Sequence, residues 1–451
     1  MHGQRPPRFL TGLALAAAIS MAGCEAAGLS TPSMPSIPGV SSLFGKEADP
    51  PLPGHRISVL SSAETTGATT DVEAKEAVLL PEPQSNASWS QPGGVASNSP
   101  GHLAFSGNGK QVWREDAGSG SSSGGRITAI PIVHDGKVFT LDRRGLVTAF
   151  AMNGGELWHV SLKPEDEKAD SGYGGGLAAD GDKVYAATGF GTVTALSISG
   201  GKQLWTKNLG VPIRTSPTAS GGKVFVVNSE SQLFALNGAD GKEMWTGRGL
   251  PEGAEILTNV SPAVAGNLVV VSFPSGEVTA LDANTGQQKW TDSVSGGGAT
   301  TTITSIGEAA RPVIDGDMVL ASSQAGRLIA TAIKSGERVW SRDLRSDQTP
   351  AVAGDTVFVV DTGGRLYALA RKTGKIRWVA TLPEARIWTG PTLAGGKLWV
   401  ISNKGLLVGV EAKTGQIATK TDLDVPVYIQ PIVANGRMFV LTDKARLIAM
   451  N

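Results

Sequence analysis

The chain contains one cysteine, Cys24, among its 451 residues. A lone thiol forms no disulfide within the chain, so the sequence excludes a disulfide-stapled scaffold. Histidines are also few, and none has the spacing to a second ligand that a metal site needs: His2, His55, His102, His134 and His159. The sequence therefore gives no sign of a disulfide framework or of a histidine-based metal centre.

The sequence has no excess of charge of either sign, with 40 lysines and arginines against 40 aspartates and glutamates. Because nucleic acid attracts a concentrated basic surface, this balance argues against a nucleic-acid partner. No nucleophile elbow, phosphate loop or dinucleotide fingerprint occurs in a strand–helix context. The Asp-Gly pairs suit hairpin turns, and no loop gathers the carboxylates that calcium requires: Asp135-Gly136, Asp180-Gly181 and Asp315-Gly316. We therefore expect no catalytic, metal-binding or cofactor-binding residue.

The N-terminal apolar run is too short for a comfortable transmembrane helix and is typical of an export signal. Phe9–Met21 is apolar and alanine-rich, and it follows Arg5 and Arg8. It ends in Met21-Ala22-Gly23-Cys24, which resembles the lipobox of bacterial lipoproteins. The resemblance implies that residues 1–23 are a signal peptide and that Cys24 is acylated, while Glu25 favours the outer membrane. An ordinary secretory signal with an incidental cysteine is the alternative.

Residues 25–85 have few aromatic side chains and are rich in proline, serine, alanine and glycine. Such a segment buries too little apolar area to offset the entropy of ordering it. We therefore expect residues 24–85 to form a flexible tether behind the acylated cysteine. Ordered structure is expected from Asn86, so that residues 86–451 form the folded domain.

Glycine, by contrast, is abundant, with 59 residues, and it punctuates a repeat. Pro350–Trp378 contains three short strand-like runs and the start of a fourth, separated by turns such as Thr373-Gly374. Related copies begin at eight positions: Pro131, Gly176, Pro217, Pro262, Pro312, Pro350, Pro391 and Pro431. Repeats of about 40–45 residues with four strands each are typical of propeller blades. The sequence therefore predicts an all-β fold, an eight-bladed β-propeller of four-stranded antiparallel blades.

The two ends of the repeat region complement each other. Lys110–Trp113 resembles the end of a repeat without the strands before it, whereas the last copy stops at Asn451 before its fourth strand. Since an open sheet edge invites unwanted pairing, we expect the N-terminal strand to complete the last blade and close the ring.

Seven of the ten tryptophans occupy one repeat position: Trp113, Trp158, Trp205, Trp245, Trp290, Trp340 and Trp378. A residue that recurs in nearly every blade is most economically a packing element between blades, and not a ligand-binding residue. Thr419 replaces the tryptophan in one copy, and we expect a weaker contact between blades there.

The repeat core, as in Leu281–Trp290, resembles the pyrroloquinoline quinone (PQQ) type of propeller repeat from about residue 101 to the end. Two families carry this repeat: the quinoprotein dehydrogenases, which hold PQQ and calcium, and BamB, a lipoprotein of the outer-membrane β-barrel assembly machine. Quinoprotein alcohol dehydrogenases share a vicinal cysteine pair and long insertions, and this chain has neither. The lipobox, the tether and the near-minimal blades resemble BamB. This resemblance implies a non-enzymatic scaffold without a cofactor, anchored to the outer membrane and monomeric within its complex. The alternatives are a periplasmic lipoprotein propeller with another partner and a small PQQ-dependent dehydrogenase.

The segments that lead from one blade into the next vary in length, and residues 291–311 form the longest. In BamB the lead-in loops of the fourth and fifth blades meet the periplasmic domains of BamA, the barrel-forming subunit. The resemblance maps these loops to residues 253–261 and 297–311. It implies a contact with BamA through Ile256, Leu257, Thr258, Asn259 and Glu308. The family's loops carry an arginine after the apolar residues and a pair of aspartates, which this chain lacks, so the apolar pair is the stronger candidate. For residues 291–311, a flexible insertion without a partner is the alternative.

Overall fold

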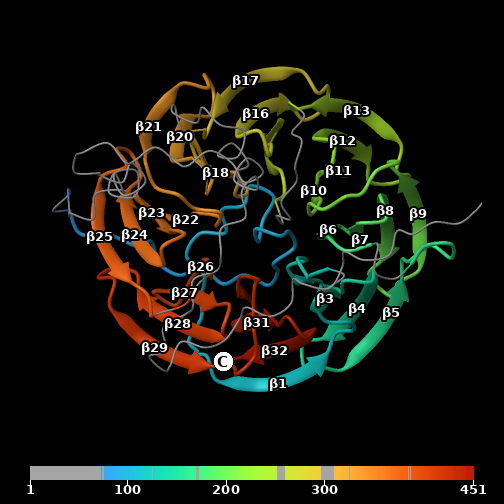
Figure 1. The fold of residues 1–451 in the computed structure, drawn as a ribbon, viewed down its shortest axis with the longest axis horizontal. Helices are drawn as coiled ribbons and strands as arrows, with labels where there is room; N and C mark the ends of the chain where they lie inside the picture. Colours follow the sequence, from blue (N-terminus) through green and yellow to red (C-terminus); the bar gives the residue numbers. More distant parts are fainter. Residues whose placement is uncertain are drawn as a thin grey trace, which may run out of the picture. The chain divides into compact units, whose positions relative to one another are not determined.

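The computed structural model describes residue 73 and residues 76–123, 125–168, 172–250, 260–295, 309–324, 326–383, 385 and 387–451. Within these residues, 32 strands form eight four-stranded antiparallel sheets arranged around a common axis (Figure 1). The predicted eight-bladed β-propeller is therefore confirmed. The described residues contain no helix with the length and hydropathy needed to cross a membrane.

Blades 1 to 4 follow the chain order, with the first strand nearest the axis (Figure 1). Blade 1 contains β2 (Ile132–His134), β3 (Lys137–Leu141), β4 (Leu146–Ala151) and β5 (Glu156–Ser161). Blade 2 contains β6 (Gly175–Asp180), β7 (Lys183–Thr188), β8 (Thr192–Ser197) and β9 (Gln203–Asn208). Blade 3 contains β10 (Thr218–Ser220), β11 (Lys223–Val227), β12 (Gln232–Asn237) and β13 (Glu243–Arg248). Blade 4 contains β14 (Ala263–Ala265), β15 (Leu268–Ser272), β16 (Glu277–Asp282) and β17 (Gln288–Ser293).

Blades 5 to 7 repeat this order, and blade 8 combines the two ends of the described chain. Blade 5 contains β18 (Val313–Asp315), β19 (Met318–Ala321), β20 (Leu328–Ala332) and β21 (Arg338–Arg342). Blade 6 contains β22 (Ala351–Ala353), β23 (Thr356–Val360), β24 (Arg365–Ala370) and β25 (Ile376–Thr381). Blade 7 contains β26 (Trp388–Ala394), β27 (Lys397–Ser402), β28 (Leu406–Glu411) and β29 (Ile417–Asp422). Blade 8 contains β30 (Ile432–Ala434), β31 (Arg437–Leu441), β32 (Arg446–Met450) and β1 (Gln111–Asp116).

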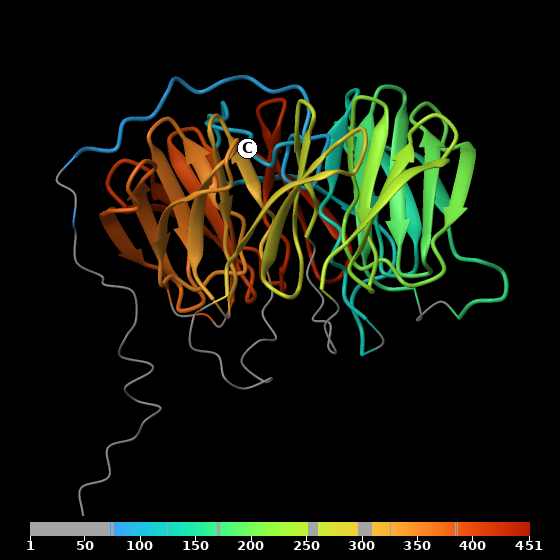
Figure 2. The ribbon, with the colours of Figure 1, turned by 90° about the horizontal axis from the view of Figure 1, so that it is seen from above.

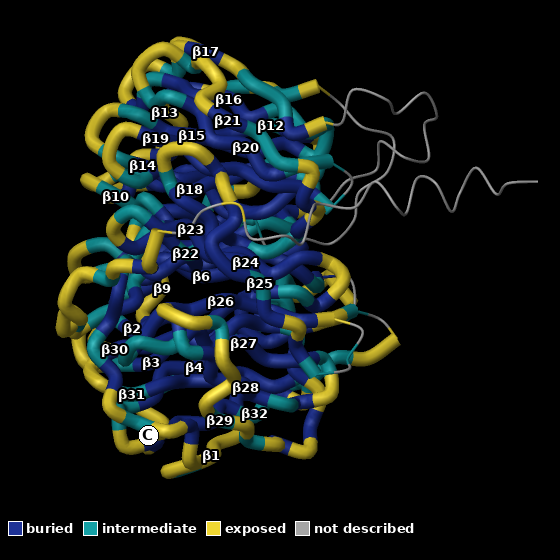
Figure 3. Tube along the Cα trace, turned by 90° about the vertical axis from the view of Figure 1, so that its left-hand side faces the viewer, coloured by how far each residue is buried: buried dark blue, intermediate teal, exposed yellow. Residues whose placement is uncertain are grey.

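The burial of each strand follows its place in the blade. Second and third strands such as β23 are buried on both faces, because neighbouring blades cover them, and their sequences are nearly continuous apolar runs. Outer strands such as β9 alternate between exposed and half-buried residues. Figure 3 shows this pattern as a buried interior with exposed turns at its margins.

The ring closes as the sequence predicts. β1 pairs antiparallel with β32, so that Trp113 lies opposite Ala449 and Asp116 opposite Arg446. Lys110 and Asn451 extend the ladder, each donating its backbone N–H to the other's carbonyl, at 2.7 and 2.9 Å. The outer edge of β32 is therefore paired, and β1 is the outermost strand of blade 8, as the fourth strand is in the other blades.

The recurrent tryptophans join neighbouring blades, which confirms their predicted packing role. Each indole Nε1 donates a hydrogen bond of 2.8–3.2 Å to a backbone carbonyl of the following blade. Each ring also covers the turn glycine of that blade. At Gly374, for example, a Cβ would lie 2.7 Å from the Trp340 ring, and φ is +68°. The tryptophan of one blade and the turn glycine of the next therefore form a single contact between the two blades.

The blade with Thr419 uses a different aromatic residue at this contact. Trp399 on β27 packs edge-to-face against Phe105, with ring centroids 5.5 Å apart. The turn glycine before β1, Gly109, lies against Trp399 and Leu407. The Thr419 hydroxyl is buried and makes no hydrogen bond.

Because strands alternate in direction, the loops fall on two faces. We call the face with the tight turns after first and third strands the turn face, and the face with the connections between blades the lead-in face. Residues 84–104, here called the axial segment, run along the turn face around the axis (Figures 1 and 2). Their backbone and side chains hydrogen-bond to the first strands of seven blades, at Val433, Val133, Ala179, Ala219, Val264, Ile314 and Leu393.

Residues before the axial segment also contact the blades. Val78 is buried in the apolar cluster of blades 6 and 7, and Glu76 forms a salt bridge with Arg377 at 3.4 Å. Glu73 donates its backbone N–H to the Ile376 carbonyl and pairs with Arg342 at 2.9 Å. The predicted domain boundaries at residues 23 and 85 stay predictions.

Candidate partner-binding face and axial cavity

The six residues singled out in the sequence lie outside the described part of the chain. Ile256, Leu257, Thr258 and Asn259 belong to residues 251–259, Glu308 belongs to residues 296–308, and Cys24 precedes residue 73. Their predicted roles therefore stay predictions. The structure does describe the residues at which the two predicted loops rejoin the propeller.

Those residues meet at one place. Val260 lies in the described end of the first loop and Ala309 in that of the second, and both line a cavity of about 240 Å³ on the axis. We call it the axial cavity. Six lead-in segments contribute to its wall, and its lining residues are Arg126, Ile127, Thr128, Ile130, Val260, Ala309, Ala310, Arg311, Asp347, Gln348, Thr349, Ile387, Thr389, Tyr428, Ile429 and Gln430.

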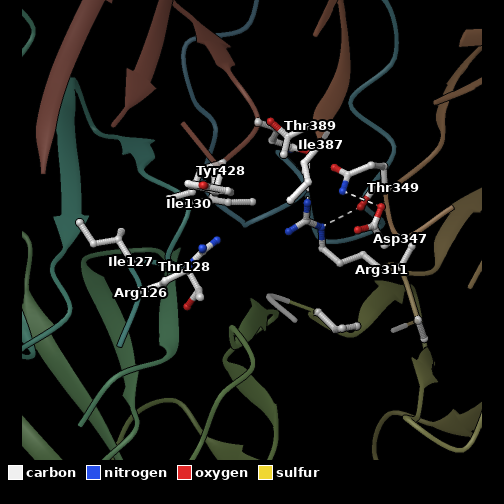
Figure 4. Close-up of a pocket in the computed structure, with 16 residues that line it drawn as sticks. Arg126, Ile127, Thr128, Ile130, Arg311, Asp347, Thr349, Ile387, Thr389 and Tyr428 are labelled. Carbon is white, nitrogen blue, oxygen red and sulfur yellow. Dashed lines mark hydrogen bonds between the residues drawn. The ribbon is translucent and has the colours of Figure 1, made fainter. Parts of the chain in front are cut away.

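Arg311 reaches from the start of blade 5 towards the middle of the axial cavity (Figure 4). Its side chain is buried, and Nε donates to the Thr349 hydroxyl at 3.0 Å while Nη2 donates to the Gln430 side-chain oxygen at 3.1 Å. Burial lowers the pKa of the Arg311 guanidinium to about 10, because water stabilises the charged form better than the protein interior does. The group is still a cation at neutral pH.

The axial cavity has a floor on the side of the turn face. Thr349 and Gln430 also line a second, smaller void of about 20 Å³, whose other wall includes Trp89, Gly93 and Asn98 of the axial segment. The layer of Arg311, Thr349 and Gln430 therefore separates the axial cavity from the axial segment.

Arg126 stands opposite Arg311 across the axial cavity (Figure 4). Its guanidinium stacks on the Tyr428 ring, 4.2 Å from the ring centroid. A second stack with the same separation, Arg214 on Tyr173, lies in the neighbouring lead-in segments outside the cavity. Among the described lining residues Asp347 is the one carboxylate, and it accepts a 2.9 Å hydrogen bond from the Gln348 side-chain amide.

Exposed apolar side chains also occur in the lead-in segments. Leu250, the last described residue before the first predicted loop, is 60% exposed, and Ile387 at the axial cavity is 40% exposed. Exposed aliphatic residues near tyrosine and arginine are the composition of many protein interfaces. The lead-in face therefore has the chemistry of a docking surface.

The lining does not suit calcium and a quinone. Calcium needs several oxygen ligands, whereas the described lining residues of the axial cavity include a single carboxylate, that of Asp347. Within the described ranges, no group of three histidine, cysteine, aspartate or glutamate residues has the geometry to hold a metal ion. We therefore derive no quinone-dependent chemistry from this site.

The fold and the repeat define the class: an eight-bladed propeller built from PQQ-type repeats, with its candidate site on the lead-in face. A family model described as "Outer membrane protein assembly factor BamB" matches residues 143–380 and 380–451. The chain belongs to this BamB family.

Individual proteins agree with this placement. BamB of Shigella dysenteriae is 38% identical over 221 residues, which are 48% of this chain and 56% of that relative. The chain thus matches little more than half the length of this relative. Among solved structures, BamB of Moraxella catarrhalis superposes with a TM-score of 0.65 at 20% identity, over 75% of this chain and 98% of that one. Quinohaemoprotein alcohol dehydrogenase of Comamonas testosteroni gives a TM-score of 0.66 at 13% identity, over 80% of each chain. At such identities these two structures show the fold alone.

The sequence motifs do not predict the axial cavity, although the repeat contains a signal for it. Four lining residues directly precede a repeat start: Ile130, Arg311, Thr349 and Gln430. In these four blades the residue at this position lines the cavity, so a charged residue there is a signal for the centre of the propeller. Arg311 is the one charged residue among those that precede the eight starts.

Proposed function

We propose that this chain is a non-enzymatic scaffold lipoprotein of the outer-membrane β-barrel assembly complex. In this proposal it binds the periplasmic domains of BamA and, with other subunits, assists the insertion of outer-membrane proteins. Residues 1–23 are the signal peptide, Cys24 carries the lipid, and the following residues up to 85 connect the lipid to the propeller. The protein is then anchored to the outer membrane and faces the periplasm.

One observation carries the choice of the lead-in face. The described ends of the two predicted loops, Val260 and Ala309, line the same cavity, although 48 positions separate them in the chain. The turn face is less suited to a large partner, because the axial segment already occupies its centre. We therefore place the BamA contact on the lead-in face, through Ile256, Leu257, Thr258, Asn259 and Glu308 in the loops and Leu250 beside them.

Affinity purification from detergent-solubilised outer membranes tests the proposal. A tagged protein with its native N-terminus is expected to retain BamA as a stoichiometric partner. The matched control is Leu79→Asp, because Leu79 is 68% exposed and lies beside the turn-face glycine Gly354. Leu250→Asp is expected to reduce the recovery of BamA, and Leu79→Asp to leave it unchanged. Recovery of a different periplasmic protein without BamA would contradict the proposal.

A further inference from the structure

We propose that the axial cavity is a binding site for a carboxylate that carries a small apolar body. The carboxylate lies between the guanidinium groups of Arg311 and Arg126, and the apolar body lies against the surrounding isoleucines. This inference concerns the isolated propeller, so it stands or falls independently of the contact with BamA.

The charge of the described lining residues favours an anion. Arg126 and Arg311 contribute two positive charges and Asp347 one negative charge, which leaves a net charge of +1 among the described lining residues. Figure 4 shows the two arginine side chains extending into the cavity from opposite sides. Guanidinium groups form strong, charge-assisted hydrogen bonds with carboxylates, and these bonds are strongest where water is excluded.

Burial of Arg311 adds to this preference. The depressed pKa of Arg311 records that its surroundings stabilise the positive charge less well than water does. A carboxylate in the axial cavity would offset part of this desolvation cost. Thr349 and Gln430 hold two edges of the guanidinium, so the group is positioned before any ligand arrives.

The volume and the apolar wall of the axial cavity determine the size and polarity of the ligand apart from its carboxylate. An apolar cavity of about 150 Å³ is large enough for benzene, and this cavity has about 240 Å³. Its apolar wall includes Ile127, Ile130, Ile387 and Ile429. A ligand the size of benzoate or hexanoate places an aromatic or short aliphatic body against these side chains, with the carboxylate at the arginines.

Calorimetric titration of the purified propeller with benzoate, hexanoate and benzamide tests the proposal. Benzamide matches benzoate in size and shape but carries no charge. Both carboxylates are expected to bind with one-to-one stoichiometry, and benzamide at least about tenfold more weakly, since it lacks charge-assisted bonds. Absence of carboxylate binding at millimolar concentrations, or equal affinity for benzoate and benzamide, would overturn the proposal.

Two pairs of variants locate the site. Arg126→Glu changes the lining charge from +1 to −1 at an exposed position. It should weaken benzoate binding by about tenfold. Arg214→Glu is the matched control, because Arg214 makes the same 4.2 Å stack on a tyrosine outside the cavity. Arg311→Gln should abolish binding. If the glutamine variant does not fold, Arg311→Lys replaces it in the test and should retain part of the binding. Equal losses for Arg126→Glu and Arg214→Glu would overturn the assignment to this cavity.

A competition experiment identifies the source of the carboxylate, and this last step rests on the proposed function. If excess benzoate weakens binding of the BamA periplasmic domains, the natural carboxylate is a side chain of the docked partner. If benzoate and BamA bind together, it is a free organic acid. The Arg126→Glu and Arg214→Glu pair places benzoate in the axial cavity, so both results of the competition refer to this site.

Discussion

Replacing Gln91 by alanine tests how far the axial segment stabilises the propeller. The Gln91 side chain is buried between blades 2 and 3. Its Nε2 donates to the carbonyls of Ala179 and Ala219, both at 2.8 Å, and its Oε1 accepts from the Ala219 N–H at 2.9 Å. Alanine leaves these three backbone groups without a partner in a buried place.

The expected cost follows from these bonds. A buried hydrogen bond contributes about 1 kcal/mol net, and an unsatisfied buried partner costs about 1–3 kcal/mol. We therefore expect Gln91→Ala to lower the free energy of unfolding by about 3 kcal/mol. Gln91→Leu should cost about as much, because it keeps the side-chain volume and removes the same bonds. Gln416→Ala, at an exposed position directly before β29, should change stability by less than about 0.5 kcal/mol.

Urea unfolding followed by tryptophan fluorescence measures these differences, since the indoles lie at the contacts between blades. If Gln91→Leu has the same midpoint urea concentration of unfolding as the wild type, the hydrogen bonds of Gln91 do not stabilise the propeller. The axial segment would then be a passive cover of the turn face.

Three further predictions concern closure, anchoring and chemistry. Deleting residues 101–116 removes β1 and leaves the edge of β32 unpaired, so the variant should aggregate or lose cooperative unfolding; an unchanged melting curve would exclude a stabilising role for the β1–β32 pair. Cys24→Ala should block acylation and release the protein from the outer-membrane fraction, whereas an acylated variant in mass spectra would refute the lipobox assignment. Purified protein incubated with PQQ and calcium should show no dye-linked oxidation of alcohols or sugars, and measurable turnover would restore the dehydrogenase alternative.

The architecture was predictable from the sequence because each blade repeats the same pattern of strands and turn residues. The turn glycine and the tryptophan of each repeat form a single contact between neighbours, so their spacing encodes how blades pack as well as where strands end. Ring closure was predictable for a similar reason, because the fragment before Trp113 and the last copy each lack what the other provides.

The axial segment and the axial cavity were not predictable in this way. Residues such as Gln91 and Asn98 contact blades that are more than 100 positions away, and no repeat marks them. The cavity depends on residues from six lead-in segments, whose convergence appears only when the ring is built. Thr419 shows a further limit, because its missing tryptophan is compensated by Trp399, a residue at a different repeat position.

Binding of purified BamA periplasmic domains is the most direct test of the proposed docking face. The wild type is compared with the double variant Ile256→Asp and Leu257→Asp, with Glu308→Ala, and with the turn-face control Leu79→Asp, each checked for an unchanged melting temperature. Central apolar anchors typically contribute about 2 kcal/mol or more, so the double variant should bind at least about 30-fold more weakly. Glu308→Ala should lose under about 1 kcal/mol, and Leu79→Asp should bind like the wild type. Equal affinity of the wild type and the double variant would contradict the placement of BamA on the lead-in face.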